Sequence, residues 1–248
     1  MSGAPFVATP ASLLPELSAP EELVLLARTL WREGYDDHLA GHITYRQGDG
    51  TLLCTPWLLL WEEIRPEDVL VIDRDGHLLE GRWPVPLGIP LHLELHRQRE
   101  DVVVAVHSHP QFGTAWADAR RIPPCYDQSS ALGGGEITVV DEYDGPVNDP
   151  AAAARAVTAM GDAAMALLVN HGVFVTAGSV RAAHQRAVAL EYRCRRAFQV
   201  ECLGGGRELP DPARSFFRAS DGEGFAGFFE AMARQELRRD PTLLGGSA

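Results

Sequence analysis

The sequence predicts a layered α/β or α+β domain built around a mixed β-sheet. Two hairpin signals occur in the first third of the chain, and long helical segments occupy much of the last third. Between them, short apolar runs alternate irregularly with helical patterns. No internal repeat and no long linker divides the 248 residues. This length suits one large domain with a sizeable core, or at most two small domains.

The first third of the chain predicts one helix followed by two hairpins. Pro20-Glu21-Glu22 suits the first turn of a helix, which we expect to continue to about Trp31. Two turn sequences, Gly48-Asp49-Gly50 and Asp75-Gly76, then mark the hairpins. The strands of these hairpins are expected within 41–55, and at 69–73 and 78–80.

The remaining two thirds predicts helices and strands in alternation. Asp149 before Pro150 is typical of a helix N-terminus, with the aspartate as N-cap. Ser179 caps the longest helix, which ends before Gly204-Gly205-Gly206. The β-branched run at 102–106 is typical of a strand buried on both faces. Helices are expected at about 87–99, 112–119, 150–160, 179–201 and 224–238, and strands at 102–106, late in 133–140, at 166–169 and at 173–176.

The charge of the chain excludes several classes of function. The net charge is 22 − 34 = −12. Binding to nucleic acid or to an anionic membrane needs clustered cations, so a strongly acidic chain is a poor candidate for either. All 22 basic residues are arginine. The absence of lysine excludes a lysine Schiff base, a pyridoxal phosphate anchor and a P-loop lysine. Carbon–carbon bond chemistry would therefore need another electron sink, for which a metal is the obvious candidate.

The cysteines and the N-terminus favour a cytoplasmic protein. The four cysteines form no C-x-x-C pair, and their spacing matches neither a zinc site nor a disulfide scaffold, so we expect them to be reduced. The first 17 residues lack a basic start and contain three prolines, which argues against a signal peptide. Apolar runs fall far short of the roughly 20 residues that span a bilayer. The cysteines are Cys54, Cys125, Cys194 and Cys202.

The sharpest local signal is His107-Ser108-His109, which follows the apolar run at 102–106. Residues two apart on a strand face the same way, so both imidazoles can hold one divalent ion. A surface or core histidine pair is the alternative. His171, in Asn170-His171-Gly172, offers a third imidazole between two strand-like segments, or an incidental histidine in a turn. Three histidines would leave coordination positions open, as a catalytic metal requires.

His92 and His96 form a second candidate pair. In the helix expected at 87–99 they lie one turn apart on one face, which is a spacing of many zinc sites. His96 sits among Arg97, Gln98 and Arg99, which favours a solvated or core role over a ligand role. His92 can equally line a site or belong to the core.

Two further histidines and two tryptophans are weaker candidates. His38 and His42 can line a pocket or simply decorate a loop and a strand. Trp57 and Trp61 bracket Leu58-Leu59-Leu60, where an aromatic pocket wall competes with ordinary core packing, the more common use of such a run.

Several segments, in this order, resemble the class II aldolase/adducin family over about residues 20–205. The resemblance implies a single-domain α/β/α layered fold with a central mixed, largely antiparallel sheet, preceded by a loose leader at 1–19. A C-terminal extension with one helix is expected at 206–248. Members of this family usually assemble as tetramers with active sites at subunit interfaces. The matching segments are 41–46, 66–73, 91–96, 99–102, 106–110 and 170–172.

The resemblance implies a metal site and a set of residues around it. His107, His109 and His171 match the metal ligands of the family, for one divalent transition metal such as Zn, Mn or Fe. Tyr126 and Asp127 lie where members of the family send residues into a neighbouring subunit's site. The candidate catalytic residues are His42, His92 and Tyr126, and the candidate substrate-binding residues are Trp57, His42 and Asp127.

The chain departs from the sugar-phosphate aldolases of this family at three places. Gly88 stands where they carry a glutamate, nineteen residues before His107. His42 replaces an asparagine after Gly41, and Trp57-Leu58 replaces the Ser-Gly that helps to hold phosphate. An ordinary sugar-phosphate aldolase is therefore not expected, and three histidines can be the whole ligand set.

These departures predict a metal-dependent lyase, most simply a decarboxylase of a non-phosphorylated hydroxy or aromatic acid. Loss of carbon dioxide needs an electron sink but no base to remove a first proton. Water, His42, His92 or Tyr126 would protonate the carbanion, and an anionic substrate would be steered by arginines. The first alternative is a non-haem iron(II) oxygenase that cleaves an aromatic acid side chain, which would need dioxygen. Less favoured are a sugar aldolase or epimerase and a non-catalytic adducin-like module.

Overall fold

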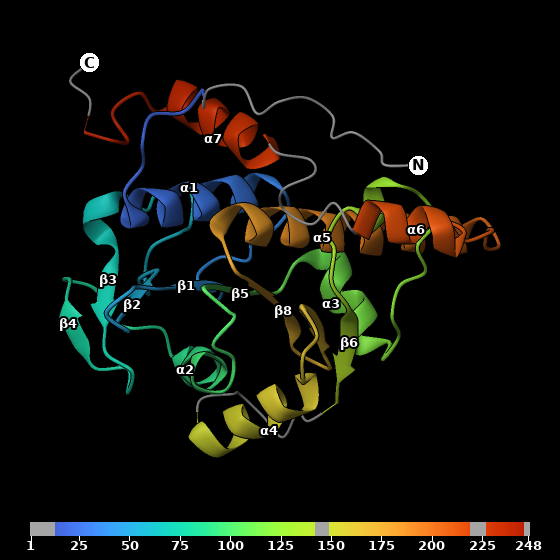
Figure 1. Ribbon diagram of the computed structural model, residues 1–248, viewed down its shortest axis with the longest axis horizontal. Helices are drawn as coiled ribbons and strands as arrows, with labels where there is room; N and C mark the ends of the chain where they lie inside the picture. The colour runs from blue at the N-terminus through green and yellow to red at the C-terminus, as the bar shows by residue number, and fades with distance from the viewer. Residues whose placement is uncertain (1–12, 142–148, 219–226, 246–248) are drawn as a thin grey trace.

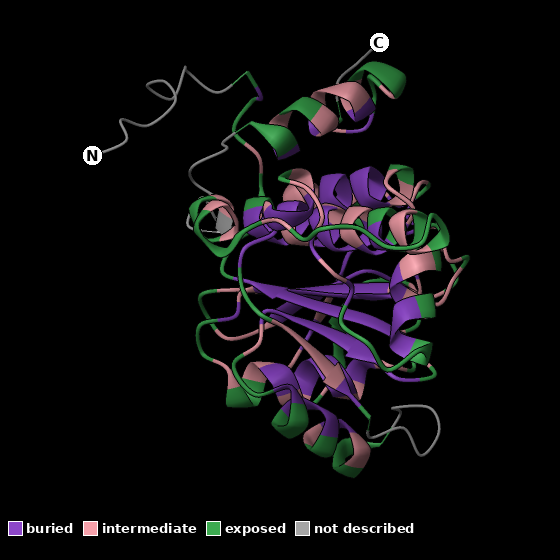
Figure 2. Cartoon of the chain, turned by 90° about the vertical axis from the view of Figure 1, so that its right-hand side faces the viewer, coloured by how far each residue is buried: buried purple, intermediate pink, exposed green. Residues whose placement is uncertain are grey.

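The structure is a computed structural model that describes residues 13–141, 149–218 and 227–245. One eight-stranded sheet lies between two layers of helices, with α1 and α5 on one face and α2 and α4 on the other (Figure 1). The central strands are almost wholly buried between these layers (Figure 2), whereas the edge strand at 78–80 is exposed. This arrangement confirms the α/β/α layered fold.

The sheet is mixed but largely antiparallel, as predicted. Its order is β4-β3-β2-β1-β5-β8-β7-β6, and only β6 and β7 pair in parallel. Both hairpins form where the turn sequences place them, and β1 pairs with β2 on one edge and with β5 on the other. The strands are β1 (His42–Arg46), β2 (Leu52–Cys54), β3 (Leu70–Ile72), β4 (Leu78–Glu80), β5 (Val104–Ser108), β6 (Ile137–Val140), β7 (Met165–Leu168) and β8 (Gly172–Ala177).

The helix starts agree with the capping signals of the sequence. The Asp149 side chain accepts hydrogen bonds from the N–H groups of Ala151 and Ala152, and Ser179 accepts one from Ala182. Besides the 3-10 turns η1 (Pro66–Asp68) and η2 (Ser129–Ala131), the helices are α1 (Ala19–Arg32), α2 (Ile89–Gln98), α3 (Gln111–Asp118), α4 (Pro150–Met160), α5 (Val180–Cys202), α6 (Asp211–Arg218) and α7 (Phe228–Arg239).

Two expectations about these elements are corrected. The strand expected at 102–106 is β5, which begins later because the Val102 N–H closes a turn on the Arg99 carbonyl. The segment 206–248 contains two helices, α6 and α7, where one was expected. The pair Asp211-Pro212 repeats the helix-start signal of Asp149-Pro150. It follows the glycines at 204–206, which favour a loop, and for that reason no helix is expected there from the sequence. Residues 1–12 of the expected leader and 224–226 of the last expected helix lie outside the described residues.

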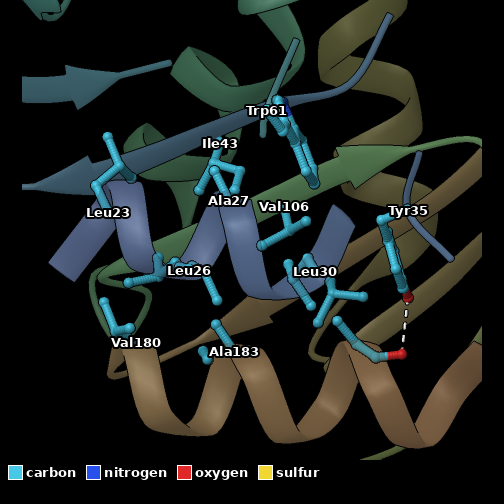
Figure 3. Close-up of a cluster of buried hydrophobic side chains, with 14 of the residues drawn as sticks. Leu23, Leu26, Ala27, Leu30, Tyr35, Ile43, Trp61, Val106, Val180 and Ala183 are labelled. Atoms are coloured by element: carbon cyan, nitrogen blue, oxygen red, sulfur yellow. Dashed lines mark hydrogen bonds between the residues drawn. The ribbon is translucent and has the colours of Figure 1, made fainter. Parts of the chain in front are cut away.

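The main core lies between α1, α5 and the sheet (Figure 3). Leu23, Leu26 and Leu30 of α1 have no exposed surface, and burying each stabilises the fold by about 1.5–3 kcal/mol. The Tyr35 hydroxyl crosses this core to donate to the Ala187 carbonyl at 2.8 Å. Trp61 is also buried here, which confirms the core interpretation of that residue.

The last helix covers the outer side of α1, so that α1 is buried almost all round (Figure 1). Asp240, just beyond α7, accepts hydrogen bonds from Arg28 at 3.2 Å and from Arg65 at 3.0 Å. Arg32 pairs with Glu236, which is almost completely buried. The C-terminal segment is thereby tied to the first helix. Within the described residues, no helix is long and apolar enough to cross a bilayer.

Candidate functional site

The three histidines of the predicted metal site converge at one end of β5 and β8. His107 lies near the end of β5, His109 directly follows that strand, and His171 directly precedes β8. Their ring centroids are 4.6–5.0 Å apart, and one nitrogen from each ring lies within 4.8 Å of the others. His171, at least 62 positions further along the chain, thus joins His107 and His109 in one cluster that could hold a metal ion.

The turn before β8 explains the sequence Asn-His-Gly. Asn170 adopts a left-handed φ of 55°, which asparagine tolerates better than most residues. A Cβ atom on Gly172 would lie 2.5 Å from Cδ2 of His109 and 2.6 Å from the Ser108 carbonyl oxygen. Only glycine therefore lets β8 approach closely enough for His171 to meet the other two rings.

Hydrogen bonds orient two of these rings. Nδ1 of His107 donates to the Val173 carbonyl oxygen at 2.9 Å, and Nδ1 of His109 is hydrogen-bonded to the Asp37 carboxylate. Because a carbonyl and a carboxylate oxygen only accept, each Nδ1 carries a hydrogen, which leaves Nε2 of each ring as the nitrogen that could bind a metal. Metal-binding histidines commonly have such outer partners.

The charge state of the cluster also suits a metal. Burial lowers the pKa of His107 well below its ordinary value, and burial together with His109 lowers the pKa of His171 to about 4. Neutral imidazole is the form that binds a metal. The donor set, its protonation and its outer partners therefore fit a divalent transition metal.

A second group of possible ligands, Asp73, Asp75 and His77, lies in the exposed turn between β3 and β4. The Asp73 carboxylate already accepts from the N–H groups of Asp75 and His77 and pairs with the His77 ring. This group is explained by the turn that it holds together.

Three more histidines form a hydrogen-bonded row beside the cluster. His42 on β1 lies opposite His107 on β5, with ring centroids 4.8 Å apart. Nδ1 of His42 is 2.8 Å from Nε2 of His92 on α2. The Thr44 hydroxyl lies between Nδ1 of His92 at 2.8 Å and Nε2 of His96 at 2.9 Å. His96 is half-buried and belongs to this polar row, so it is not an ordinary core residue.

Gly88, at the start of α2, and His42 occupy complementary space. A Cβ atom at position 88 would lie 2.8 Å from Cε1 of His42 and closer still to Nε2. The edge of the His42 ring thus faces the space that a side chain at position 88 would enter.

Comparison with known proteins identifies the family. A family model described as Class II Aldolase and Adducin N-terminal domain matches residues 21–198. The chain belongs to the class II aldolase and adducin family. It is 32% identical over 214 residues to 3,4-dihydroxyphthalate decarboxylase of Arthrobacter keyseri, covering 81% of this chain and 86% of that protein.

Other relatives show how varied the class II aldolase and adducin family is. The chain is 27% identical over 220 residues to 4-hydroxy-3-prenylphenylpyruvate oxygenase/4-hydroxy-3-prenylbenzoate synthase of Streptomyces roseochromogenus subsp. oscitans, covering 86% of this chain and 79% of that protein. The solved L-fuculose 1-phosphate aldolase of Glaciozyma antarctica PI12 shares the fold, with a TM-score of 0.77. That structure is 20% identical and covers 93% of this chain and 96% of its own.

Trp57 and Leu58 lie in a turn. Leu58 has a φ of 79°, in the left-handed region that favours glycine, and its side chain is half exposed. Trp57 is half-buried, and its N–H donates to the Pro84 carbonyl. A role for Trp57 in binding substrate stays a prediction, and His38 is exposed in its loop.

Tyr126 and Asp127 have local partners in the single chain. The Asp127 carboxylate accepts from the N–H and hydroxyl of Ser130 and pairs with Arg196 at 3.3 Å. Tyr126 packs beside Gly206. Their expected role in a neighbouring subunit concerns an assembly of chains and stays a prediction.

The sequence interpretation missed Asp37 and Thr44. Asp37 lies 72 positions before His109, so no local pattern links them. Thr44 could have been found, because residues two apart on a strand share a face. His42, Thr44 and Arg46 therefore form one face of β1, and that face meets α2.

Proposed function

We propose that this protein is a metal-dependent decarboxylase of a non-phosphorylated, hydroxylated aromatic carboxylic acid. The observation that carries the proposal is the cluster of His107, His109 and His171, combined with glycine at position 88. The similarity to a 3,4-dihydroxyphthalate decarboxylase over most of both chains supports the same reaction class.

In this proposal the three clustered histidines hold one ion of Zn, Mn or Fe. Such an ion, when bound, supplies an electron sink and a centre for chelating adjacent substrate oxygens. The Val173 carbonyl and the Asp37 carboxylate hold two of the ligand rings in place. The chain itself then has to bind the acid, exclude water and supply one proton after carbon dioxide leaves.

The residues around the cluster favour decarboxylation over ordinary aldol cleavage. Decarboxylation needs no base at its first step, and position 88 offers no carboxylate. The half-exposed Leu58 and the indole of Trp57 replace the polar phosphate loop, which favours an aromatic substrate without phosphate. A 3,4-dihydroxyphthalate-like acid has the adjacent hydroxyl and carboxylate oxygens that chelation requires.

The test is a decarboxylation assay without oxygen. Protein purified without chelator is analysed for metal and then loaded with Zn, Mn or Fe(II) under argon. With 3,4-dihydroxyphthalate, we expect release of carbon dioxide and 3,4-dihydroxybenzoate, and no cleavage of L-fuculose 1-phosphate. Failure of every metal form to decarboxylate any of a panel of hydroxylated aromatic acids would contradict the proposal.

The oxygenase-like relative supports a second candidate, a non-haem iron(II) oxygenase acting on an aromatic acid. The same assay separates the two candidates, because a decarboxylase turns over under argon and an oxygenase does not.

We further expect a cytoplasmic homotetramer with active sites at its interfaces. Analytical ultracentrifugation tests the assembly, and a Tyr126→Phe variant tests the contribution of Tyr126 to turnover.

A further inference from the structure

We propose that Glu191 of α5 is a positioning residue for the rings of His107 and His109. Its carboxylate fixes the start of α3 between the segments that hold these two rings. The proposal deepens the proposed function and rests on it for the metal ion. The placement of the rings follows from contacts within the chain.

The start of α3 comes directly after the His109 ring, with Pro110 as its N-cap. The first N–H groups of a helix have no partner within the helix, and the Pro110 side chain offers none. Glu191 supplies the missing acceptors from another helix. One carboxylate oxygen accepts from the N–H of Phe112 at 3.0 Å, and the other accepts from the N–H of Gly113 at 2.7 Å. Both oxygens are therefore used on the segment that follows His109.

The start of α3 also touches the strand that orients His107. A Cβ atom on Gly113 would lie 2.7 Å from Cγ1 of Val173 on β8 and 3.2 Å from Cγ of Pro110. Val173 is the residue whose carbonyl accepts from Nδ1 of His107. Because a packed interior leaves no free space, a shift of α3 here displaces Val173 or Pro110, and with them a ligand ring.

Glu191 lies beside the loop that holds His109 from its other side. This loop, between α1 and β1, carries the Asp37 carboxylate that is hydrogen-bonded to Nδ1 of His109. A Cβ atom on Gly34, in the same loop, would lie 3.9 Å from Cγ of Glu191. The Tyr35 hydroxyl ties the loop to α5 as well. One carboxylate thus borders both segments that orient the His109 ring.

Further contacts between α3 and α5 make a change at Glu191 local. The Trp116 indole N–H donates to the Cys194 carbonyl at 2.9 Å, and the ring centroids of Phe112 and Phe198 are 5.6 Å apart. The three α5 residues in these contacts lie at positions i, i+3 and i+7 of one helix face. Loss of the first contact should therefore loosen the start of α3 and leave the rest of α3 attached.

The two hydrogen bonds require an ionised carboxylate. Only that form presents both oxygens as acceptors without a hydrogen of its own. Glu191 is 7% exposed, and burial raises its pKa to about 7, although the two N–H donors and Arg195 act in the opposite direction. Asp36 also faces this carboxylate and raises its pKa. Measurements at pH 8.0 keep the group mostly ionised.

The test compares two variants that each weaken a helix start. Glu191→Gln keeps the size of the side chain, but an amide has one oxygen, and its NH₂ group opposes the second N–H. The matched control is Asp149→Ala, because the Asp149 carboxylate accepts from two N–H groups at the start of α4, on the other face of the sheet. Both variants should have a lower Tm. Proton–carbon NMR of metal-free, histidine-labelled protein then reports the surroundings of each ring.

We expect Glu191→Gln to shift the ring resonances of His107 and His109 and to leave that of the exposed His77 unchanged. Zinc affinity in a competition titration should fall about three- to tenfold, which is less than the 10- to 100-fold typical of a direct partner of a ligand. Asp149→Ala should change neither. Unshifted rings or unchanged zinc affinity in Glu191→Gln, or equal effects in Asp149→Ala, would overturn the proposal.

Two further arrangements keep the test decisive. If Glu191→Gln does not fold, Glu191→Asp replaces it, because aspartate keeps the charge but is one methylene too short to reach both N–H groups. The same outcomes then apply. Shifted rings in a protein whose wild type binds no metal would show that the proposed function has failed and that Glu191 still positions the rings. A wild type that binds zinc, with unshifted rings in the variant, would show the reverse.

Discussion

The fit between Gly88 and His42 makes Gly88→Ala the most direct test of the site geometry. The backbone at Gly88 has φ −80° and ψ 5°, which alanine adopts without strain. The new methyl group therefore acts through contact and through the weaker N-cap that alanine makes, and not through backbone strain. A methyl carbon 2.8 Å from Cε1 of His42 must move at least about 0.6 Å to reach the ordinary contact distance of 3.4 Å.

The His42 ring cannot move freely to make that room. It is hydrogen-bonded to His92 on one side and stands against His107 on the other. Overpacking of this kind costs about 1–3 kcal/mol. For a chain of this size, such a cost lowers the Tm by about 2–12 °C. Displacing His42, a candidate catalytic and substrate-binding residue, should also lower kcat/KM by about tenfold to a hundredfold.

Two matched variants separate this contact from other effects. Gly48→Ala introduces a methyl group with nothing within 4 Å, so it should leave the Tm within about 1 °C of the wild type. Gly88→Ser adds the same Cβ but a good N-cap hydroxyl, so it tests whether alanine destabilises only by weakening the start of α2. Thermal unfolding followed by circular dichroism gives the Tm. The predicted contact between a side chain at position 88 and the His42 ring would be refuted by either of two results. One is a Gly88→Ala protein with wild-type Tm and kcat/KM, and the other is a Gly88→Ser protein that regains both values.

Three further predictions address the metal ligands and a buried histidine. His109→Ala should lose its bound metal and activity while keeping its circular dichroism spectrum, and elemental analysis that finds a full metal complement would remove His109 from the ligand set. Asp37→Asn should weaken metal binding about 10- to 100-fold in a competition titration, whereas the exposed neighbour Asp36→Asn should not. His184 is buried, neither ring nitrogen has a hydrogen-bond partner among the described residues, and burial lowers its pKa to about 4. In the unfolded chain His184 binds a proton below about pH 6.5, whereas in the folded chain it stays neutral down to about pH 4. The folded state therefore loses stability as the pH falls from 6.5 towards 4. His184→Leu should therefore be more stable than the wild type to urea, with a larger advantage at pH 5.0 than at pH 7.5, and an equal difference at both values would contradict the cause.

Local patterns in the sequence were sufficient for most elements and for the pairing of His107 with His109. The capping residues Asp149 and Ser179 lie at helix starts, and Pro20-Glu21-Glu22 lies in the first turn of α1. These features depend on residues within one or two turns of each other. His107 and His109 share a face of one strand end, which strand alternation already implies. The helix at 211–218 was missed although its start carried the same kind of signal.

By itself, then, the sequence determined where helices and strands form, which imidazoles can share an ion and which chemistry the absence of lysine excludes. Only the tertiary structure decided that the polar face of β1 meets α2, so that Thr44 joins His92 to His96, and that Asp37 reaches His109. It also decided that His42 fills the space beside Gly88. The reason is that these contacts depend on the order of strands in the sheet and on which helix covers which face. Both are set by the packing of the whole chain, and the spacing of residues along one segment carries no information about either.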